Sequence, residues 1–307
     1  PGNGGGSFCG GTLISDRHVV TAGHCLTKPN DKFQSSYTVT VGYNSQHRDK
    51  QIKVKATKVD IHPNYDGTDH EKFDIVVLTI PRITFGTGAQ RMPIDDGRLE
   101  PYQPLLAVGW GGTEERNGLP NRLKGVTIKI GELSACRGVK GSFGDSNGNL
   151  VCMQKSLTPG KGTCGGDSGS TLSINRNGKQ YLVGIGSHGY GLVNGDCGSD
   201  NIMAFYTHGI SHLDFIMDKS GLKREYLLDK QANNGPPRPQ PDENADPPQP
   251  DDRDGSPPPD NRDSDGKGDV KGGDNGGGKG GDVSPPPAKE VTRTVTKTVY
   301  LVIPMPT

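Results

Sequence analysis

The sequence lacks a long apolar run, a Cys-x2-Cys pair and any Asn-x-Ser/Thr acceptor site. The first absence argues against a transmembrane helix, because a membrane span needs about 20 consecutive apolar residues. The second argues against structural zinc, which is usually held by such pairs. The third means that N-glycosylation is not expected. No basic run stands out, so nucleic acid is not an expected partner.

Apolar residues are also scarce: 30% of the 307 residues are hydrophobic, beside 47 glycines and 24 prolines. The scarcity is concentrated in residues 230–307, which are rich in proline, glycine and aspartate. From residue 232 onward 13 acidic and 9 basic residues give a net charge of −4, which leaves +4 for the remainder. Such a segment buries too little apolar surface to offset its ordering entropy. We therefore predict a folded domain over residues 1–229 and a disordered tail over 230–307.

The tail ends in VTRTVTKTVYLVIPMPT, in which β-branched residues alternate with polar ones. Such a segment could add as a strand to a partner, or it could be a linker. Its length and polarity do not suit a bilayer anchor. The repeated Thr-Val pairs suggest a tether to a surface or matrix.

All six cysteines precede residue 198. An even number confined to the folded part predicts three disulfides and a secreted, extracellular protein. No metal or other cofactor is predicted. In particular, the segment SQHRDKQ (45–51) lacks the paired acidic ligands of a calcium site.

Short β-branched or alternating runs are separated by Gly, Pro, Asn and Asp through the first 208 residues, which predicts an all-β barrel or sandwich. The predicted strands are 12–15, 37–42, 52–61, 74–80, 104–110, 124–130, 170–174, 181–187 and 203–207. A helical spacing begins only at residue 210, with Leu213, Ile216 and Met217 on one face and Ser211 as the expected N-cap. We expect this single helix to close the fold.

Three motifs carry residues with catalytic chemistry: TAGHC (21–25), FDIVVL (73–78) and GGDSGS (165–170). A serine hydroxyl is a weak nucleophile until an imidazole takes its proton. A carboxylate then holds that imidazole in the correct tautomer. Glycine before the serine lets backbone N–H groups approach a developing oxyanion. Each motif alone is weak evidence, because each also occurs in ordinary turns and strand ends.

Together with FCGGTLIS, IHPNY, GWG (109–111), SHG (187–189) and FYT, in this order, the motifs resemble those of chymotrypsin/trypsin-like serine proteases. The likeness runs from Phe8 to about Leu228. It implies two antiparallel six-stranded β-barrels, the first over about residues 1–100 and the second over about 101–208. A closing helix is expected over about 209–229.

The resemblance implies that His24 is a general base, Asp74 its orienting carboxylate and Ser168 the nucleophile of a peptide-bond hydrolase. The oxyanion hole would be formed by the backbone N–H groups of Gly166 and Ser168. Protein or peptide substrates are expected, with protein inhibitors as further partners. The disulfide pairing implied by the resemblance is Cys9–Cys25, Cys136–Cys152 and Cys164–Cys197.

The specificity pocket implied by the resemblance has Gly162 at its floor, where trypsin has an aspartate, and includes Ser187, Gly189 and Ala204. Cleavage after an apolar residue is therefore expected. Two nearby residues offer an alternative preference for acidic side chains: His188 stands where the family usually has tryptophan, and Lys161 is next to Gly162.

Family members begin, after activation, with an Ile/Val-Val-Gly-Gly terminus whose ammonium group pairs with the aspartate before the serine, here Asp167. This chain begins seven residues before Phe8 without that motif, and the first strand of the first barrel is also missing. We therefore expect that the gene encodes upstream residues with such a site. We also expect the chain beginning at Pro1 to have little activity. The alternative function is that of an inactive homologue that binds or inhibits.

Overall fold

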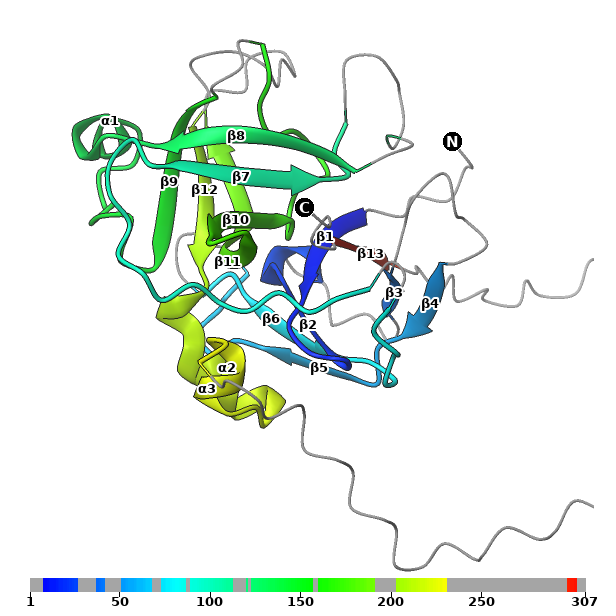
Figure 1. Cartoon of the computed structure of the whole chain (residues 1–307). Coiled ribbons are helices and arrows are strands. Elements are labelled where there is room, and N and C mark those ends of the chain that lie inside the picture. The colour runs from blue at the N-terminus through cyan, green and yellow to red at the C-terminus, as the bar shows by residue number, and fades with distance from the viewer. Residues whose placement is uncertain are drawn as a thin grey trace, which may run out of the picture. The chain divides into compact units, whose positions relative to one another are not determined.

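The computed structural model describes residues 8–26, 37–41, 51–67, 73–86, 89–112, 120, 123–156, 160–190, 203–230 and 297–302. The predicted tail lies outside the described residues except for its last strand. Figure 1 shows two β-structures packed against each other, with the C-terminal helical segment at the bottom and another short helix at the upper left. This all-β architecture with a C-terminal helical segment confirms the predicted fold class.

The first β-structure is a seven-stranded sheet with the order β4-β3-β13-β1-β2-β6-β5. Most of its strands are rich in β-branched residues, which favour extended structure. They are β1 (Phe8–Leu13), β2 (His18–Thr21), β3 (Tyr37–Val41), β4 (Ile52–Lys55), β5 (Lys58–Ile61), β6 (Val76–Thr79) and β13 (Lys297–Val302).

The predicted single strand over 52–61 is two strands, β4 and β5. The break falls where the chain changes partners: the N–H of Ala56 donates to the carbonyl of Tyr37, and that of Thr57 to the carbonyl of Thr79. β4 accordingly pairs with β3, and β5 pairs with β6.

The second β-structure is a closed antiparallel barrel of six strands with the order β10-β11-β12-β9-β8-β7, as predicted. Its strands are β7 (Pro104–Gly109), β8 (Lys124–Ile130), β9 (Leu150–Ser156), β10 (Thr171–Arg176), β11 (Lys179–Tyr190) and β12 (Met203–His208). Closure leaves this sheet without exposed edges. The strand β9 and, in the first sheet, β2 were not among the strands expected from sequence.

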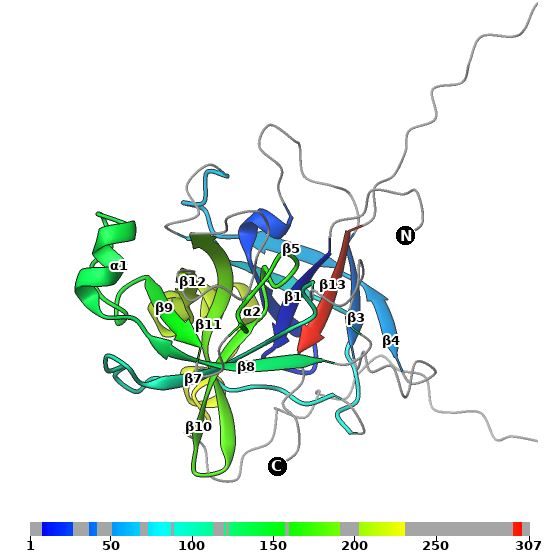
Figure 2. The same cartoon turned by 90° about the horizontal axis from the view of Figure 1, so that it is seen from above.

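The last described strand, β13, lies between β1 and β3 and is parallel to both. Phe8 to Thr12 are in register with Thr298 to Val302, and Tyr37 to Thr40 with Lys297 to Tyr300. Figure 2 shows β13 in red between these two strands. The segment expected to pair with a partner or to act as a linker thus pairs within its own chain, at a position inside the first sheet.

The expected closing helix over 209–229 consists of three pieces: η3 (Ile210–His212), α2 (Leu213–Ser220) and α3 (Arg224–Leu227). Gly221, at φ 67°, ends α2 in the left-handed conformation that favours glycine. The prediction of Ser211 as N-cap is wrong. Its hydroxyl instead donates to the carbonyl of Gly148, and α2 begins after His212 without a side-chain cap. A further helix, α1 (Leu133–Val139), precedes β9.

The core of the first sheet continues into α2, whose Leu213 and Ile216 are buried with the strand residues, while the second barrel encloses a core of its own. Hydrogen bonds join the two β-structures. The hydroxyls of Thr12 and Thr171 lie 2.6 Å apart, and the Thr207 hydroxyl donates to the carbonyl of Asp74 at 3.0 Å. Residues from both halves are therefore held in fixed relation around the candidate site.

Candidate active site

Two hydrogen bonds join His24 and Asp74. The imidazole Nδ1 of His24 lies 2.8 Å from Oδ2 of Asp74, and the backbone N–H of His24 donates to Oδ1 at 2.9 Å. The Asp74 side chain is fully buried, whereas 21% of the His24 side chain is exposed. Because the carboxylate accepts from both the ring and the backbone, it fixes the imidazole's orientation and leaves Nε2 as the nitrogen available to another group.

Local structure holds each member of this pair. His24 lies in the 3-10 helix η1 (Gly23–Cys25), and a Cβ on Gly23 would lie 2.9 Å from the Tyr65 ring, so this position requires glycine. Asp74 follows Phe73, which has φ 64°, an unusual value for a bulky residue. The Phe73 ring stacks on His62 with ring centres 4.4 Å apart. This packing holds the turn that directs Asp74 inward.

Asp74 has a second side-chain partner, and thus a third hydrogen bond, that the sequence did not reveal. The Ser187 hydroxyl donates to Oδ2 at 2.6 Å. Burial by itself would raise the pKa of Asp74, but the hydrogen bonds and charge of His24 and the hydrogen bond of Ser187 lower it below its ordinary value. Asp74 is thereby kept as an anion in a buried position. From sequence, Ser187 of the SHG motif was expected only as a residue of the specificity pocket, not as a partner of Asp74.

Ser168 lies in a turn between β9 and β10 that is hydrogen-bonded to strands of both β-structures. Its carbonyl accepts a 2.7 Å hydrogen bond from the N–H of Gly10 on β1. The N–H of Gly169 donates to Gly186 on β11 at 2.7 Å. These bonds fix the loop from both sides, so that Ser168 borders the same cavity as Ser187.

The predicted oxyanion donors lie in this loop. Gly166 has φ 96°, which favours glycine. None of the backbone hydrogen bonds among the described residues uses the N–H of Gly166 or Ser168 as donor. Both groups are therefore available to bind an oxygen atom.

The carboxylate of Asp167 is bonded to backbone groups. Oδ1 accepts from the N–H of Gly111 at 2.7 Å, and Oδ2 accepts from the N–H of Cys164 at 2.9 Å. Burial nevertheless raises the pKa of Asp167, because these two bonds offset it incompletely. No ion pair of Asp167 occurs within the described residues. The predicted pairing of Asp167 with an ammonium group stays a prediction.

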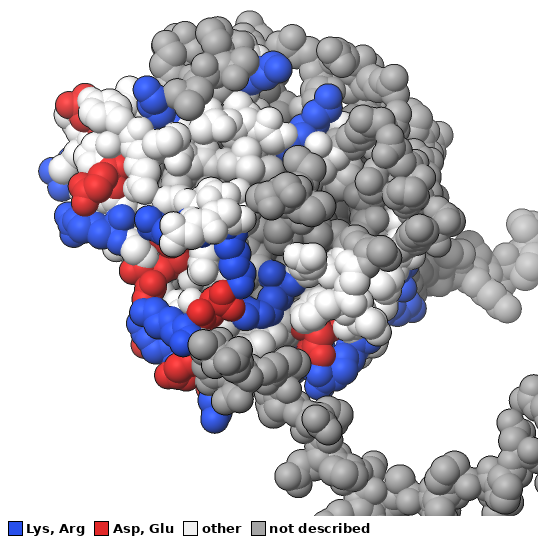
Figure 3. All heavy atoms as spheres, viewed as in Figure 1, with Lys and Arg blue, Asp and Glu red and all other residues white. Residues whose placement is uncertain are grey.

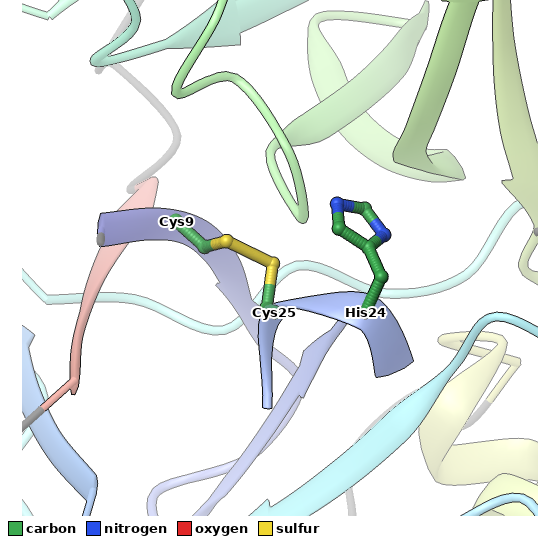
Figure 4. A group of neighbouring side chains, drawn as sticks. All are labelled: Cys9, His24 and Cys25. Atoms are coloured by element: carbon green, nitrogen blue, oxygen red, sulfur yellow. A yellow bond between two sulfur atoms is a disulfide. The ribbon is translucent and has the colours of Figure 1, made fainter. Parts of the chain in front are cut away.

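Two predicted disulfides, Cys9–Cys25 and Cys136–Cys152, are present. Cys164 is also disulfide-bonded, and its expected partner Cys197 lies outside the described residues. Figure 4 shows the first bridge beside the His24 imidazole. The Sγ atoms of Cys9 and Cys25 and a ring nitrogen of His24 lie within 4.8 Å of one another, as in a metal site. The two sulfur atoms are bonded to each other, however, and so offer no thiolate ligand.

A cavity of about 140 Å³ lies beside Ser168. Three of the four predicted pocket residues, Ser187, Gly189 and Ala204, border it, but Gly162 does not. Gly162 is exposed, as is Lys161 next to it. The residues around the cavity are Thr163, Cys164, Gly165, Asp167, Ser168, Gly186, Ser187, His188, Gly189, Ala204, Phe205 and Tyr206.

An aromatic stack forms part of this cavity's wall. The rings of His188 and Phe205 lie 5.2 Å apart and nearly parallel, at 8°. Phe143 contacts Phe205 edge-on at 5.7 Å. Burial raises the pKa of Tyr206, with a further contribution from the charge of Asp167, so its hydroxyl stays neutral. Phe205 and Tyr206 belong to the FYT motif, which carried no pocket role in the sequence.

The face shown in Figure 3 carries both basic and acidic side chains. The described Lys and Arg side chains at its lower left lie among Asp and Glu side chains. No helix within the described ranges is long and apolar enough to span a membrane.

Comparisons with known proteins agree with this architecture. The family model described as Trypsin matches residues 2–216. The chain is 29% identical over 218 residues to Trypsin Blo t 3 of Blomia tropicalis, covering 69% of this chain and 77% of that protein. It is 30% identical over 224 residues to Trypsin 5G1 of Aedes aegypti, covering 72% and 78%. It is 29% identical over 219 residues to Transmembrane protease serine 11G of Mus musculus, covering 70% and 50%. The chain belongs to the trypsin family of serine proteases.

Proposed function

We propose that the protein is a serine endopeptidase in which His24 is the general base, Asp74 its orienting carboxylate and Ser168 the nucleophile. The observation that carries this proposal is the 2.8 Å contact between His24 Nδ1 and the fully buried Asp74 carboxylate. A buried anion held by three donors stabilises the imidazolium that forms when His24 accepts a proton.

Acylation begins when Oγ of Ser168 attacks the carbonyl carbon of the substrate peptide bond and its proton moves to Nε2 of His24. The tetrahedral intermediate then expels the amine, which receives that proton, and Ser168 is left as an ester. A water molecule next gives a proton to His24 and attacks the ester carbon. The carbon–oxygen bond to Ser168 breaks, and the serine regains its proton from His24.

The oxygen that becomes negative in each tetrahedral intermediate would be bound by the N–H groups of Gly166 and Ser168. Their freedom from other backbone partners supports this role. Loss of one donor of this kind costs about 10²–10³ in rate.

We propose cleavage after apolar residues. Gly189, Ala204 and Phe205 give the cavity small or apolar walls. Both oxygens of Asp167, the acid that borders it, already accept backbone N–H groups. The exposure of Lys161, which is absent from the cavity lining, favours this preference over an acidic one. Profiling on a peptide library tests it: efficient cleavage after Arg, Lys or Glu would contradict an apolar preference.

The proposed setting is extracellular, with protein or peptide substrates and protein inhibitors as partners. The disulfides support this setting, because such bonds persist in oxidising compartments. A role of residues 230–307 as a tether is part of the proposal.

The deciding experiment treats the full-length, processed protein with casein and with a serine-directed phosphonate. We expect hydrolysis of casein and covalent labelling, both lost in Ser168→Ala while the fold is retained. An inert wild-type protein with a confirmed processed terminus would favour the binding or inhibitory alternative.

A further inference from the structure

The Ser187 hydroxyl lies between the carboxylate of Asp74 and the imidazole of His188. Its Oγ is 2.6 Å from Oδ2 of Asp74 and 3.0 Å from Nδ1 of His188. Asp74 is in turn 2.8 Å from Nδ1 of His24. A continuous series of hydrogen bonds therefore runs from His24 through Asp74 and Ser187 to the wall of the cavity beside Ser168.

The direction of these bonds follows from the protons available. A hydroxyl has one proton, and an ionised carboxylate can only accept. Ser187 therefore gives its proton to Asp74, and its oxygen must accept the bond from His188. This requires a proton on Nδ1 of His188, so the neutral ring has its lone pair on Nε2. The opposite tautomer would draw the Ser187 proton toward His188 and away from Asp74.

The His188 ring is held in place by packing as well. It stacks on Phe205, which is almost fully buried and also contacts Phe143. The Nζ of Lys140 lies 5.7 Å from the Phe205 ring centre. Besides His188 and Lys140, the titratable side chains at the cavity border within the described part of the chain are Asp167 and Tyr206, and His24 forms the other end of the series. The stack fixes the plane of the imidazole, so that Nδ1 faces Ser187.

We propose that His188 is a positioning residue for Asp74: through the Ser187 hydroxyl it joins the pocket wall to the Asp74–His24 pair. The inference rests on the proposed function, in which that pair activates Ser168. His188 keeps the Ser187 proton on Asp74, which restrains the carboxylate and sets how strongly it attracts the proton on His24. Substrate contact with the cavity wall and proton transfer at His24 are thus linked by one side chain.

The kinetic test uses the full-length, processed enzyme and an apolar peptide anilide. His188→Phe keeps a flat ring for the Phe205 stack but has no donor. We expect kcat to fall about fivefold, as for loss of one net hydrogen bond. We also expect the acidic limb of the kcat/KM profile to move to higher pH, because Asp74 attracts the His24 proton more strongly. His188→Asn places an amide donor near the Nδ1 position and should restore most of kcat.

A double-mutant cycle separates this role from simple packing. If His188 acts through Ser187, then adding His188→Phe to Ser187→Ala changes kcat no further, although KM can still change. An unchanged kcat and pH profile in His188→Phe would overturn the proposal. So would full additivity in the cycle, or a loss in His188→Asn equal to that in His188→Phe.

A measurement without catalysis distinguishes failure of this proposal from failure of the proposed function. Nitrogen-15 NMR of the wild-type protein should show His188 protonated at Nδ1 at neutral pH, with that preference weakened in Ser187→Ala. A His188 protonated at Nε2 alone would refute the positioning role even in an active enzyme. Failure of the phosphonate to label Ser168 would instead count against the proposed function.

Discussion

The backbone N–H of Gly111 donates a 2.7 Å hydrogen bond to Oδ1 of Asp167. The contact is so close that a Cβ on Gly111 would lie 2.5 Å from the Asp167 carboxyl carbon, and one on Gly109 would lie 2.0 Å from Oδ1. The two glycines of the GWG motif, Gly109 and Gly111, therefore leave the space that the Asp167 carboxylate occupies, and we call this space the Asp167 socket.

Gly111→Ala should displace Asp167 and with it the serine loop. We expect a loss of about 1–3 kcal/mol in unfolding free energy, as for overpacked sites, and at least a tenfold slower labelling of Ser168. Gly112→Ala is the matched control, because its Cβ would find its nearest neighbours at 3.7 and 3.8 Å. Denaturant titration and labelling rates measure both effects. Equal behaviour of the two variants would contradict the socket.

The two described disulfides span the same sequence separation of 16 residues. Their removal should therefore cost a similar amount, about 3 kcal/mol each in the loop-entropy model. Only Cys9–Cys25 lies beside His24 (Figure 4).

We expect Cys9→Ala/Cys25→Ala to slow Ser168 labelling under conditions where both double variants remain folded, because the bridge anchors η1 to β1. Cys136→Ala/Cys152→Ala should keep the wild-type rate. Urea unfolding compares the stabilities, and a time course of labelling compares the sites. Equal labelling by the two folded variants would show that the bridge near His24 has no local role.

The strands that sequence patterns predicted are those whose apolar residues alternate or run without interruption, such as β7 and β8. A point where the chain passes from one neighbouring strand to another is harder to predict from sequence. The break between β4 and β5 at Ala56–Thr57, for example, depends on which strand accepts each backbone N–H. The place of β13 depends on pairing with β1, 290 residues earlier in the sequence. No local pattern encodes such a contact.

The same distinction applies to the site. Sequence motifs indicated His24, Asp74 and Ser168, because a nucleophile and its base need these residue types. They did not indicate the Ser187–His188 bond or the Phe205 stack, since these depend on how β11 and β12 pack. The predicted floor residue Gly162 is exposed and lies outside the cavity lining, which its spacing from Ser168 in the sequence could not reveal.

Asp74→Asn should reduce kcat by about 10⁴ with little change in fold. The backbone N–H of His24 would hold the amide oxygen at the Oδ1 position, which leaves the NH₂ group facing the imidazole Nδ1. His24 would then carry its proton on Nε2 and could not accept one from Ser168. The matched control is Asp95→Asn, a buried carboxylate bonded to Arg176. That variant should lose stability but keep kcat, and anilide hydrolysis distinguishes the two.

His212 makes the fold sensitive to acid. Burial, with the charges of His62 and His208, lowers its pKa to about 4 from 6.5. Its Nε2 is buried without a hydrogen-bond partner among the described residues. Because the folded pKa is the lower one, the stability contributed by neutral His212 is complete above pH 6.5. It is lost as the pH falls from 6.5 through 4.

His212→Phe should flatten the fall of unfolding free energy over this interval by up to about 1.4 kcal/mol per pH unit. Phenylalanine suits the site, which is bordered by the rings of His62 and Phe73. Urea titrations at intervals from pH 8 to pH 4 measure the slope. The change in unfolding free energy between pH 7 and pH 8 is the internal control, because His212 is mostly neutral there in both the folded and the unfolded protein. Parallel curves for the two proteins down to pH 4 would refute the assignment to His212.

The strand β13 adds backbone hydrogen bonds to two neighbours at once. Without it, β1 and β3 would each present an unpaired edge, which native sheets avoid. β1 also supports the site, since Gly10 binds the Ser168 carbonyl and Cys9 is bonded to Cys25 beside His24. A loosened β1 should therefore affect both catalytic loops.

Val299→Pro tests this arrangement in the full chain, because proline removes a ladder N–H and is excluded from interior strands. Val299 is in register with Cys9 on one side and Val39 on the other. We expect faster hydrogen exchange at the amides of β1 and β3, a loss of about 1–3 kcal/mol, and slower labelling of Ser168. Lys271→Pro, in the segment between α3 and β13, is the control and should leave exchange unchanged. If the amides of residues 8–12 and 37–41 exchange at the wild-type rate in Val299→Pro, then β13 does not complete this sheet in solution.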